Sequence, residues 1–332
     1  MDHPDRVMFV VARASRLGDV DRRSRAEELL VDHATHTDEH EYVSETAETA
    51  FGPVEYAVVG TGTPVVVVHG SPGGIDAAAL MARILPRDRV SAILLSRPGY
   101  LGTPLDGRAT IDQQADLVAA LLDHLAIDRA GVYTWSGGGP AGYRVAVRHP
   151  ERVTALVANA AVSQAYEAPH QDLATRLMFT TAPGQWLLRL IAAHQPEQYV
   201  RAELDSEGDL TKEQLDRRVE EVLADPAKRD LALALGPTAV PDAHRRAGYR
   251  NDLDQFAAIT SLELEKITAP TLVLQGTADS DLPPAQSTFA ADTIPGAELL
   301  TLDTGTHLAL YTHPDAAGAQ ARVVEFLTRG GA

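Results

Sequence analysis

The amino-acid sequence predicts an α/β fold with a mostly parallel, doubly wound sheet and an all-helical insertion. The first observation is the run Val65 to Val68, because four consecutive β-branched residues are typical of a strand buried on both faces of a parallel sheet. The second is the alternation of strand-like and helix-like patterns up to Ala160, which predicts βαβ units with right-handed crossovers. The third is the stretch from about 163 to 259, where only helical patterns occur before strand-like residues return at Thr271.

Composition limits the classes of function. The 332 residues carry a net charge of −17, so nucleic acid and anionic membrane surfaces are poor partners. The absence of cysteine excludes disulfides, thiolate nucleophiles and cysteine-bound metals. The apolar run from Val7 to Ala12 is too short for a membrane span and lacks the flanks of a signal peptide. We therefore expect a cytoplasmic protein. Composition leaves open whether it is a homo-oligomer, and whether its few lysines reflect a high-salt habitat or a GC-rich genome.

The patterns divide the chain into three parts. Residues 1–42 form an N-terminal extension that is partly helical, over 21–33. The histidines at 33–40 within it are interpreted as a polar linker, since no further metal ligands cluster nearby. Residues 43–162 and 260–332 form the sheet domain, and residues 163–259 form the helical insertion.

A short motif joins a predicted strand to a predicted helix. Residues 130–135 are apolar and indicate a buried strand, and residues 140–149 indicate a helix that ends at Pro150. Between them, Ser136 is followed by three glycines. A sharp turn of this kind raises the serine hydroxyl above the sheet. It also directs the N–H group of Gly137 toward a bound carbonyl, as a nucleophile elbow requires.

This motif resembles that of the α/β-hydrolase superfamily, in particular its capped serine hydrolases of the esterase and proline iminopeptidase-like branch. The family pattern is G-x-S-x-G, and Thr134 replaces the first glycine, so we expect a more crowded elbow. The loop that begins at His69 and continues Gly-Ser-Pro resembles the family's HG-x-P loop. The resemblance implies that the N–H groups of Ser71 and Gly137 form an oxyanion hole, and we expect His69 to hold the loop by hydrogen bonds.

Two later loops extend the resemblance. Asp279 follows a predicted strand in the position of the family's acid, and Asp281 is the competing carboxylate. His307 follows the last predicted strand in the position of the family's histidine, and His313 is the weaker candidate. Together with Ser136 they occur in the order serine, aspartate, histidine that α/β-hydrolases show.

A fourth loop resembles the family more weakly. Residues 96–103 are similar to the D-x-R-G-x-G-x-S loop with Ser96 in place of the acid, and we expect a scaffold turn organised around Arg97. Within the insertion, Thr211 and Gln214 predict a capping box, and Pro226 predicts the first turn of a helix that ends before Gly236. Further helices are predicted over 172–180 and 184–194. In the family, such an insertion is a cap (lid) over the elbow.

The resemblance implies a cofactor-independent serine hydrolase that cleaves an ester-like bond of a small-molecule acyl substrate, with carboxylesterase as the generic expectation. Ser136 would attack the acyl carbon, His307 would take its proton, and Asp279 would orient the histidine, giving an acyl-enzyme that water hydrolyses. Neither a cofactor nor a metal is expected. Four residues are expected to line the pocket, although each fits a core position as well: Trp135, Phe179, Trp186 and Leu187.

Several alternatives stay open at this point. They are a proline iminopeptidase-like aminopeptidase, a lactonase, thioesterase or carbon–carbon bond hydrolase, and a small-molecule receptor that keeps the triad but has little turnover. Because the nucleophile position holds serine and not aspartate, the epoxide hydrolase and haloalkane dehalogenase reactions of the same fold are disfavoured.

Overall fold

A computed structural model of the protein describes residues 42–167 and 181–329. Contacts between residues group Ser44–Ala332 into one compact unit, which holds the sheet together with its helices. Residues 1–41 of the predicted extension over 1–42, and the whole predicted helix over 172–180, lie outside the described residues. In the part of the chain that is described, no helix combines the length and apolar character needed to cross a membrane.

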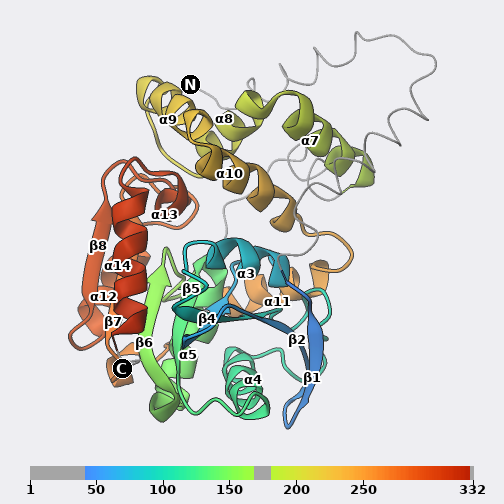
Figure 1. The fold of residues 1–332 in the computed structure, drawn as a ribbon, viewed down its shortest axis with the longest axis vertical. Helices are drawn as coiled ribbons and strands as arrows, with labels where there is room; N and C mark the ends of the chain where they lie inside the picture. Colours follow the sequence, from blue (N-terminus) through green and yellow to red (C-terminus); the bar gives the residue numbers. More distant parts are fainter. Residues whose placement is uncertain (1–41, 168–180, 330–332) are drawn as a thin grey trace. The chain divides into compact units, whose positions relative to one another are not determined.

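The described residues contain an eight-stranded sheet with the strand order β1-β2-β4-β3-β5-β6-β7-β8 (Figure 1). The six strands β4, β3, β5, β6, β7 and β8, in this order across the sheet, pair in parallel with their neighbours. Strand β2 pairs antiparallel with β1 and with β4. This confirms the predicted fold class. The strands are β1 (Glu45–Thr49), β2 (Gly52–Val59), β3 (Thr63–Val68), β4 (Val90–Leu95), β5 (Ala130–Trp135), β6 (Val153–Asn159), β7 (Thr271–Gly276) and β8 (Glu298–Leu302).

Helices cover the sheet because its strands are apolar on both faces. All six residues of β5 are buried, and successive side chains point to opposite faces. Val132 belongs to the core cluster formed with α4 and α5, while Gly131 faces Leu327 of α14. The helices of the sheet domain are α3 (Ile75–Ala82), α4 (Ile111–His124), α5 (Gly139–Arg148), α12 (Ala285–Thr293), α13 (Ala309–Thr312) and α14 (Ala316–Thr328).

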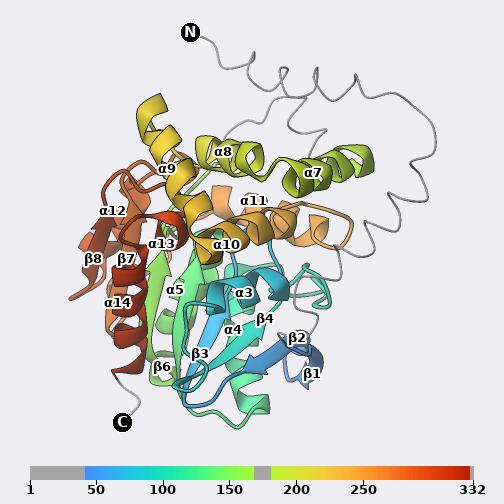
Figure 2. The ribbon, with the colours of Figure 1, turned by 45° about the horizontal axis from the view of Figure 1, so that its top comes forward.

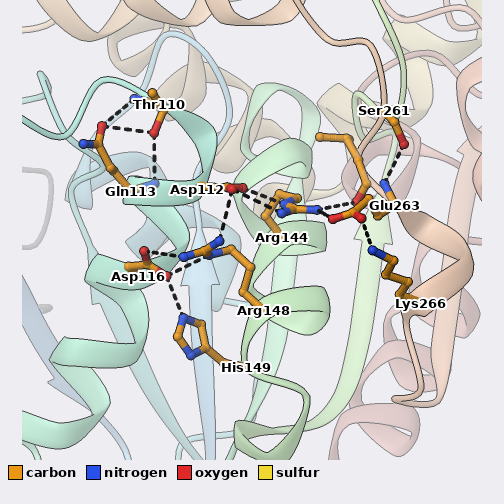
Figure 3. Close-up of polar contacts among 11 residues, drawn as sticks. Thr110, Asp112, Gln113, Asp116, Arg144, Arg148, His149, Ser261, Glu263 and Lys266 are labelled. Atoms are coloured by element: carbon orange, nitrogen blue, oxygen red, sulfur yellow. Dashed lines mark hydrogen bonds and ion pairs between the residues drawn. The ribbon is translucent and has the colours of Figure 1, made fainter.

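Ion pairs fasten α5, the helix that follows the motif serine. The capping box of Thr110 and Gln113 begins α4, and Figure 3 shows the acidic side chains of that helix facing arginines of α5. Arg144 lies between Asp112 of α4 and Glu263 of the loop before β7, at 2.6 Å from each. The pairs fix α5 against its neighbours on two sides, and with it the turn at its N-terminus.

The chain between β6 and β7 is helical wherever it is described. Its helices are α7 (Ala182–His194), α8 (Pro196–Ser206), α9 (Lys212–Ala224), α10 (Pro226–Thr238) and α11 (Arg246–Ala257). The predicted capping box of Thr211 and Gln214 is present at the start of α9. The predicted end of α10 before Gly236 is wrong, because the helix continues to Thr238, whose hydroxyl donates a hydrogen bond to the carbonyl of Leu235.

The helical insertion lies over one edge of the sheet. Val200, Leu204, Val219 and other apolar residues of α8, α9 and α10 form a small core of their own. Helix α10 contacts α3 and α13, and Figures 1 and 2 show α8, α9 and α10 beyond the carboxyl ends of the parallel strands. In parallel α/β sheets this is the edge at which ligands bind.

Candidate active site

The turn at Ser136 has the backbone conformation of a nucleophile elbow. Strand β5 ends at Trp135, a short 3-10 turn spans Ser136–Gly138, and α5 begins at Gly139. The φ angle of Ser136 is 52°, in the left-handed region that non-glycine residues rarely adopt. Such strain persists only where the surrounding structure imposes it, and it is concentrated at functional sites.

Thr134 fits into the elbow because the helix opposite it begins with small residues. A methyl group added at Gly142 of α5 would lie 2.9 Å from both Cβ and Cγ2 of Thr134. The glycine therefore leaves the space that the β-branched side chain occupies. The Thr134 hydroxyl is buried and has no hydrogen-bond partner in the described structure, so this position requires its shape and not its polarity.

The loop after β3 approaches the elbow closely. A methyl group added at Gly137 would lie 2.4 Å from Cβ of Ser71, and one added at Gly70 would lie 3.2 Å from Cβ of Ser136. The N–H group of Ser71 donates to no backbone carbonyl within the described residues. The N–H group of Gly137 belongs to the first turn of a helix, where intrahelical partners are lacking. The backbone of the loop after β3 and that of the turn at Ser136 thus lie side by side.

His69 has the structural role that the sequence predicts. It is fully buried, its Nδ1 lies 2.7 Å from the carbonyl of Gly70, and its Nε2 lies 2.9 Å from the backbone nitrogen of Arg97. Because the carbonyl can only accept and the backbone N–H can only donate, Nδ1 carries the proton and the ring is neutral. Burial and the nearby Arg97 hold the pKa of His69 well below its ordinary value.

Asp252 of α11 connects the helical insertion to two loops beside Ser136, the loop after β3 and the loop after β4, which are called the elbow loops below. Its carboxylate accepts hydrogen bonds from Arg97 at 2.6 and 2.9 Å, from Tyr100 at 2.5 Å and from Ser71 at 2.7 Å. Arg97 also donates to the carbonyls of His69 and Gly70. Arg97 is therefore the centre of a scaffold, as predicted, whereas the sequence contains no signal that pairs it with Asp252.

Asp279 and His307 meet at the carboxyl ends of β7 and β8. Oδ2 of Asp279 lies 2.8 Å from Nδ1 of His307. The other oxygen of Asp279 accepts from the backbone N–H groups of Asp281 and Leu282. The His307 side chain is 4% exposed, and its ring stacks on Trp135 with 5.4 Å between the ring centres. Asp279 therefore holds the imidazole by one nitrogen and leaves the other available.

The competing residues occupy other positions around this pair. The carboxylate of Asp281 lies 3.6 Å from Nε2 of His307, on the side of the ring opposite Asp279, and it is about half exposed. His313 faces away, since its Nε2 contacts the carbonyl of Asp303 at 2.8 Å. Sequence reasoning missed Glu207, whose carbonyl accepts from the N–H of His307 at 3.0 Å.

The predicted residues are only partly brought together. Ser136 lies next to the loop of Ser71, and Trp135 contacts His307. No hydrogen bond joins the hydroxyl of Ser136 to His307 in the described structure. Leu187 lies in α7 and is half-buried. Phe179 and the side chain of Trp186 lie outside what the structure describes.

Comparison with known proteins identifies the family. Residues 63–314 match the alpha/beta hydrolase fold family. The chain belongs to the α/β-hydrolase family. A solved structure, an alpha/beta hydrolase fold protein from Nakamurella multipartita, is 50% identical, with a TM-score of 0.85, covering 87% of this chain and 100% of that one.

Two curated relatives are also hydrolases. The uncharacterized hydrolase YcgS of Bacillus subtilis (strain 168) is 27% identical over 77% of this chain and 89% of its own length. The pimeloyl-[acyl-carrier protein] methyl ester esterase of Aromatoleum aromaticum (strain DSM 19018 / LMG 30748 / EbN1) is 27% identical over 80% of this chain and 98% of its own length.

Carboxylates dominate the electrostatics of this α/β-hydrolase site. Burial by itself would lower the pKa of His307, but the charge and hydrogen bond of Asp279, with the charges of Asp281 and Glu207, raise the pKa above its ordinary value. Burial and the charges of Asp281 and Asp279 raise the pKa of Glu207, against the opposing influence of His307. An imidazolium that forms here is therefore strongly stabilised.

Proposed function

We propose that this α/β-hydrolase is a cofactor-independent serine hydrolase that cleaves ester-like bonds through an acyl-enzyme. Ser136 is the nucleophile, His307 is the general base and then the general acid, and Asp279 orients the histidine. The proposal is supported above all by the 2.8 Å contact between Asp279 and Nδ1 of His307. That contact leaves Nε2 as the nitrogen that can take a proton, at the sheet edge where the strained Ser136 stands.

The proposed sequence of steps uses groups of this chain alone. The hydroxyl of Ser136 attacks the acyl carbon while its proton passes to Nε2 of His307, and the backbone N–H groups of Ser71 and Gly137 stabilise the oxyanion. The imidazolium then protonates the leaving group. A water molecule, deprotonated by the same nitrogen, releases the acid and restores the serine.

The helices between β6 and β7 are proposed to form the cap of this site. Their support is the contact of α10 with α3 and α13 and the hydrogen bonds of Asp252 and Glu207 to the loops of the site. A cover of this kind would exclude water from the acyl-enzyme and limit the size of the acyl group. Among hydrolases, a carboxylesterase activity is favoured because the methyl ester esterase of Aromatoleum aromaticum aligns with this chain over 98% of its own length.

The test combines covalent labelling with turnover. The wild-type protein is expected to react with a fluorophosphonate at Ser136 and to hydrolyse short nitrophenyl esters. Ser136→Ala should abolish labelling and lower turnover by roughly 10⁶-fold if the three residues act as a unit. Absence of labelling in folded wild-type protein would refute the proposal, while labelling without turnover on any ester, lactone, thioester or aminoacyl substrate would favour a receptor.

A further inference from the structure

Three side chains from three separate loops meet beside His307. Glu207 follows α8, Asp281 follows β7, and His307 follows β8. One ligand atom from each residue lies within 4.8 Å of the other two. These atoms are two carboxylate oxygens and an imidazole nitrogen, which together form a donor set suited to zinc.

Two of the three side chains have a metal-coordinating atom that makes no hydrogen bond within the described residues. His307 is 4% exposed, and its Nε2 makes no hydrogen bond within the described structure although it faces Asp281 at 3.6 Å. Oε2 of Glu207 is buried and likewise has no hydrogen-bond partner in that part of the chain. Both side chains therefore keep an atom that can coordinate a metal ion.

The spacing and support also fit a metal ion. Tetrahedral ligands about 2.1 Å from a zinc ion lie roughly 3.4 Å apart. The carboxylate of Asp281 lies 3.6 Å from Nε2 of His307, and the ligand atom of Glu207 lies within 4.8 Å of both. The hydrogen bond from Nδ1 of His307 to Asp279 is the arrangement by which carboxylates orient histidine ligands. The half-exposed Asp281 provides a route from solvent.

The backbone holds the three loops together without a metal. The carbonyl of Glu207 accepts hydrogen bonds from the N–H groups of His307 at 3.0 Å and Ser280 at 3.4 Å, and the N–H of Asp209 donates to the carbonyl of Ala278 at 2.8 Å. The ligand atoms are therefore close before any ion binds, which reduces the cost of ordering them.

From this geometry we infer that Glu207, Asp281 and Nε2 of His307 bind a zinc ion, and that this ion inhibits the enzyme. The ion takes the lone pair that Nε2 needs to accept the proton of Ser136, so metal binding and catalysis exclude each other. The inhibition rests on the proposed function, whereas the binding does not.

Binding is measured by calorimetric titration of the full, tag-free chain with zinc chloride. The wild-type protein should show a site that Glu207→Gln and Asp281→Asn each weaken by at least about tenfold, since even indirect supports of a metal commonly contribute that much. Glu203→Gln is the matched control, because Glu203 lies one turn earlier on α8 and also has a buried, unpaired oxygen, but is not part of the cluster. Zinc bound elsewhere gives a background common to all four proteins.

Equal zinc affinity in wild type, Glu207→Gln and Asp281→Asn would overturn the site. Should Glu207→Gln fail to fold, Asp281→Asn decides the question alone, because Asp281 is half-exposed and its replacement should not prevent folding. Inhibition is measured separately, as fluorophosphonate labelling of Ser136 with and without zinc. Labelling that zinc does not slow, in a protein that binds it through these residues, would overturn the inhibition. A protein that never labels would refute the proposed function and leave the calorimetric result standing.

Discussion

Replacing Asp252 with asparagine tests how the elbow loops are held. The carboxylate accepts four hydrogen bonds, two from Arg97 and one each from Tyr100 and Ser71, and the side chains of Arg97 and Asp252 are each 2% exposed. Asparagine has nearly the same volume but only one side-chain oxygen. Because Arg97 donates to both carboxylate oxygens of Asp252, the NH₂ group of asparagine would face an N–H group of Arg97 in either orientation. The variant leaves the Arg97 charge buried without a carboxylate. We expect the free energy of unfolding to fall by about 3–5 kcal/mol.

The measurement is urea unfolding followed by circular dichroism, with wild type and variant at the same pH. The midpoint should fall while the dependence on urea stays unchanged, as expected when stability alone changes. Asp254→Asn is the control, because Asp254 lies in the same helix but is exposed, and it should change stability by less than about 0.5 kcal/mol. A loss of under about 1 kcal/mol for Asp252→Asn would refute the view that this ion pair anchors the loops.

Three further predictions concern single residues. Asp279→Asn should lower turnover by roughly 10⁴-fold because it removes the orienting acid, with Asp281→Asn much milder in the same ester assay; the reverse order would show that the acid is misassigned. Thr134→Val should raise the free energy of unfolding by about 1 kcal/mol, since it removes a buried, unpaired hydroxyl, and a loss of stability in urea would contradict that. The hydrogen bonds from Arg144 and Lys266 lower the pKa of Glu263 from 4.5 to about 2. Its contribution to stability is present above pH 4.5 and is lost as the pH falls toward 2. Glu263→Gln should therefore lose less stability than wild type between pH 5 and pH 2.5, which unfolding at both pH values checks.

The parts of the site that short motifs determine could be predicted from the sequence. The position of Ser136 follows from the apolar run before it and the glycines after it, which permit a turn that few other sequences allow. The structural role of His69 follows from its place directly after β3, where its ring can form hydrogen bonds with nearby backbone groups. In both cases the deciding contacts lie within a few residues or at a strand end.

The contacts between distant segments could not be predicted. Asp252 is separated from Arg97 by 155 residues along the chain, and its neighbours in α11 give no pattern that distinguishes it from an exposed helical aspartate. The contact of Glu207 with His307 could not be predicted either. It is made by the backbone carbonyl of Glu207, and every residue type has a backbone carbonyl. The sequence predicts helix α8 and helix α11 only as part of a helical stretch, since their apolar stripes are short.

The attachment of Glu207 and Asp209 to the loops of Asp279 and His307 has a consequence for protein engineering. Grafting the helical segment of a relative onto this scaffold would exchange more than the helices themselves. It would also replace the backbone hydrogen bonds of Glu207 and Asp209 that hold the loops of Asp279 and His307 in place. A chimaera designed to change selectivity should therefore keep residues 207–209 from the recipient and join the foreign helices outside them.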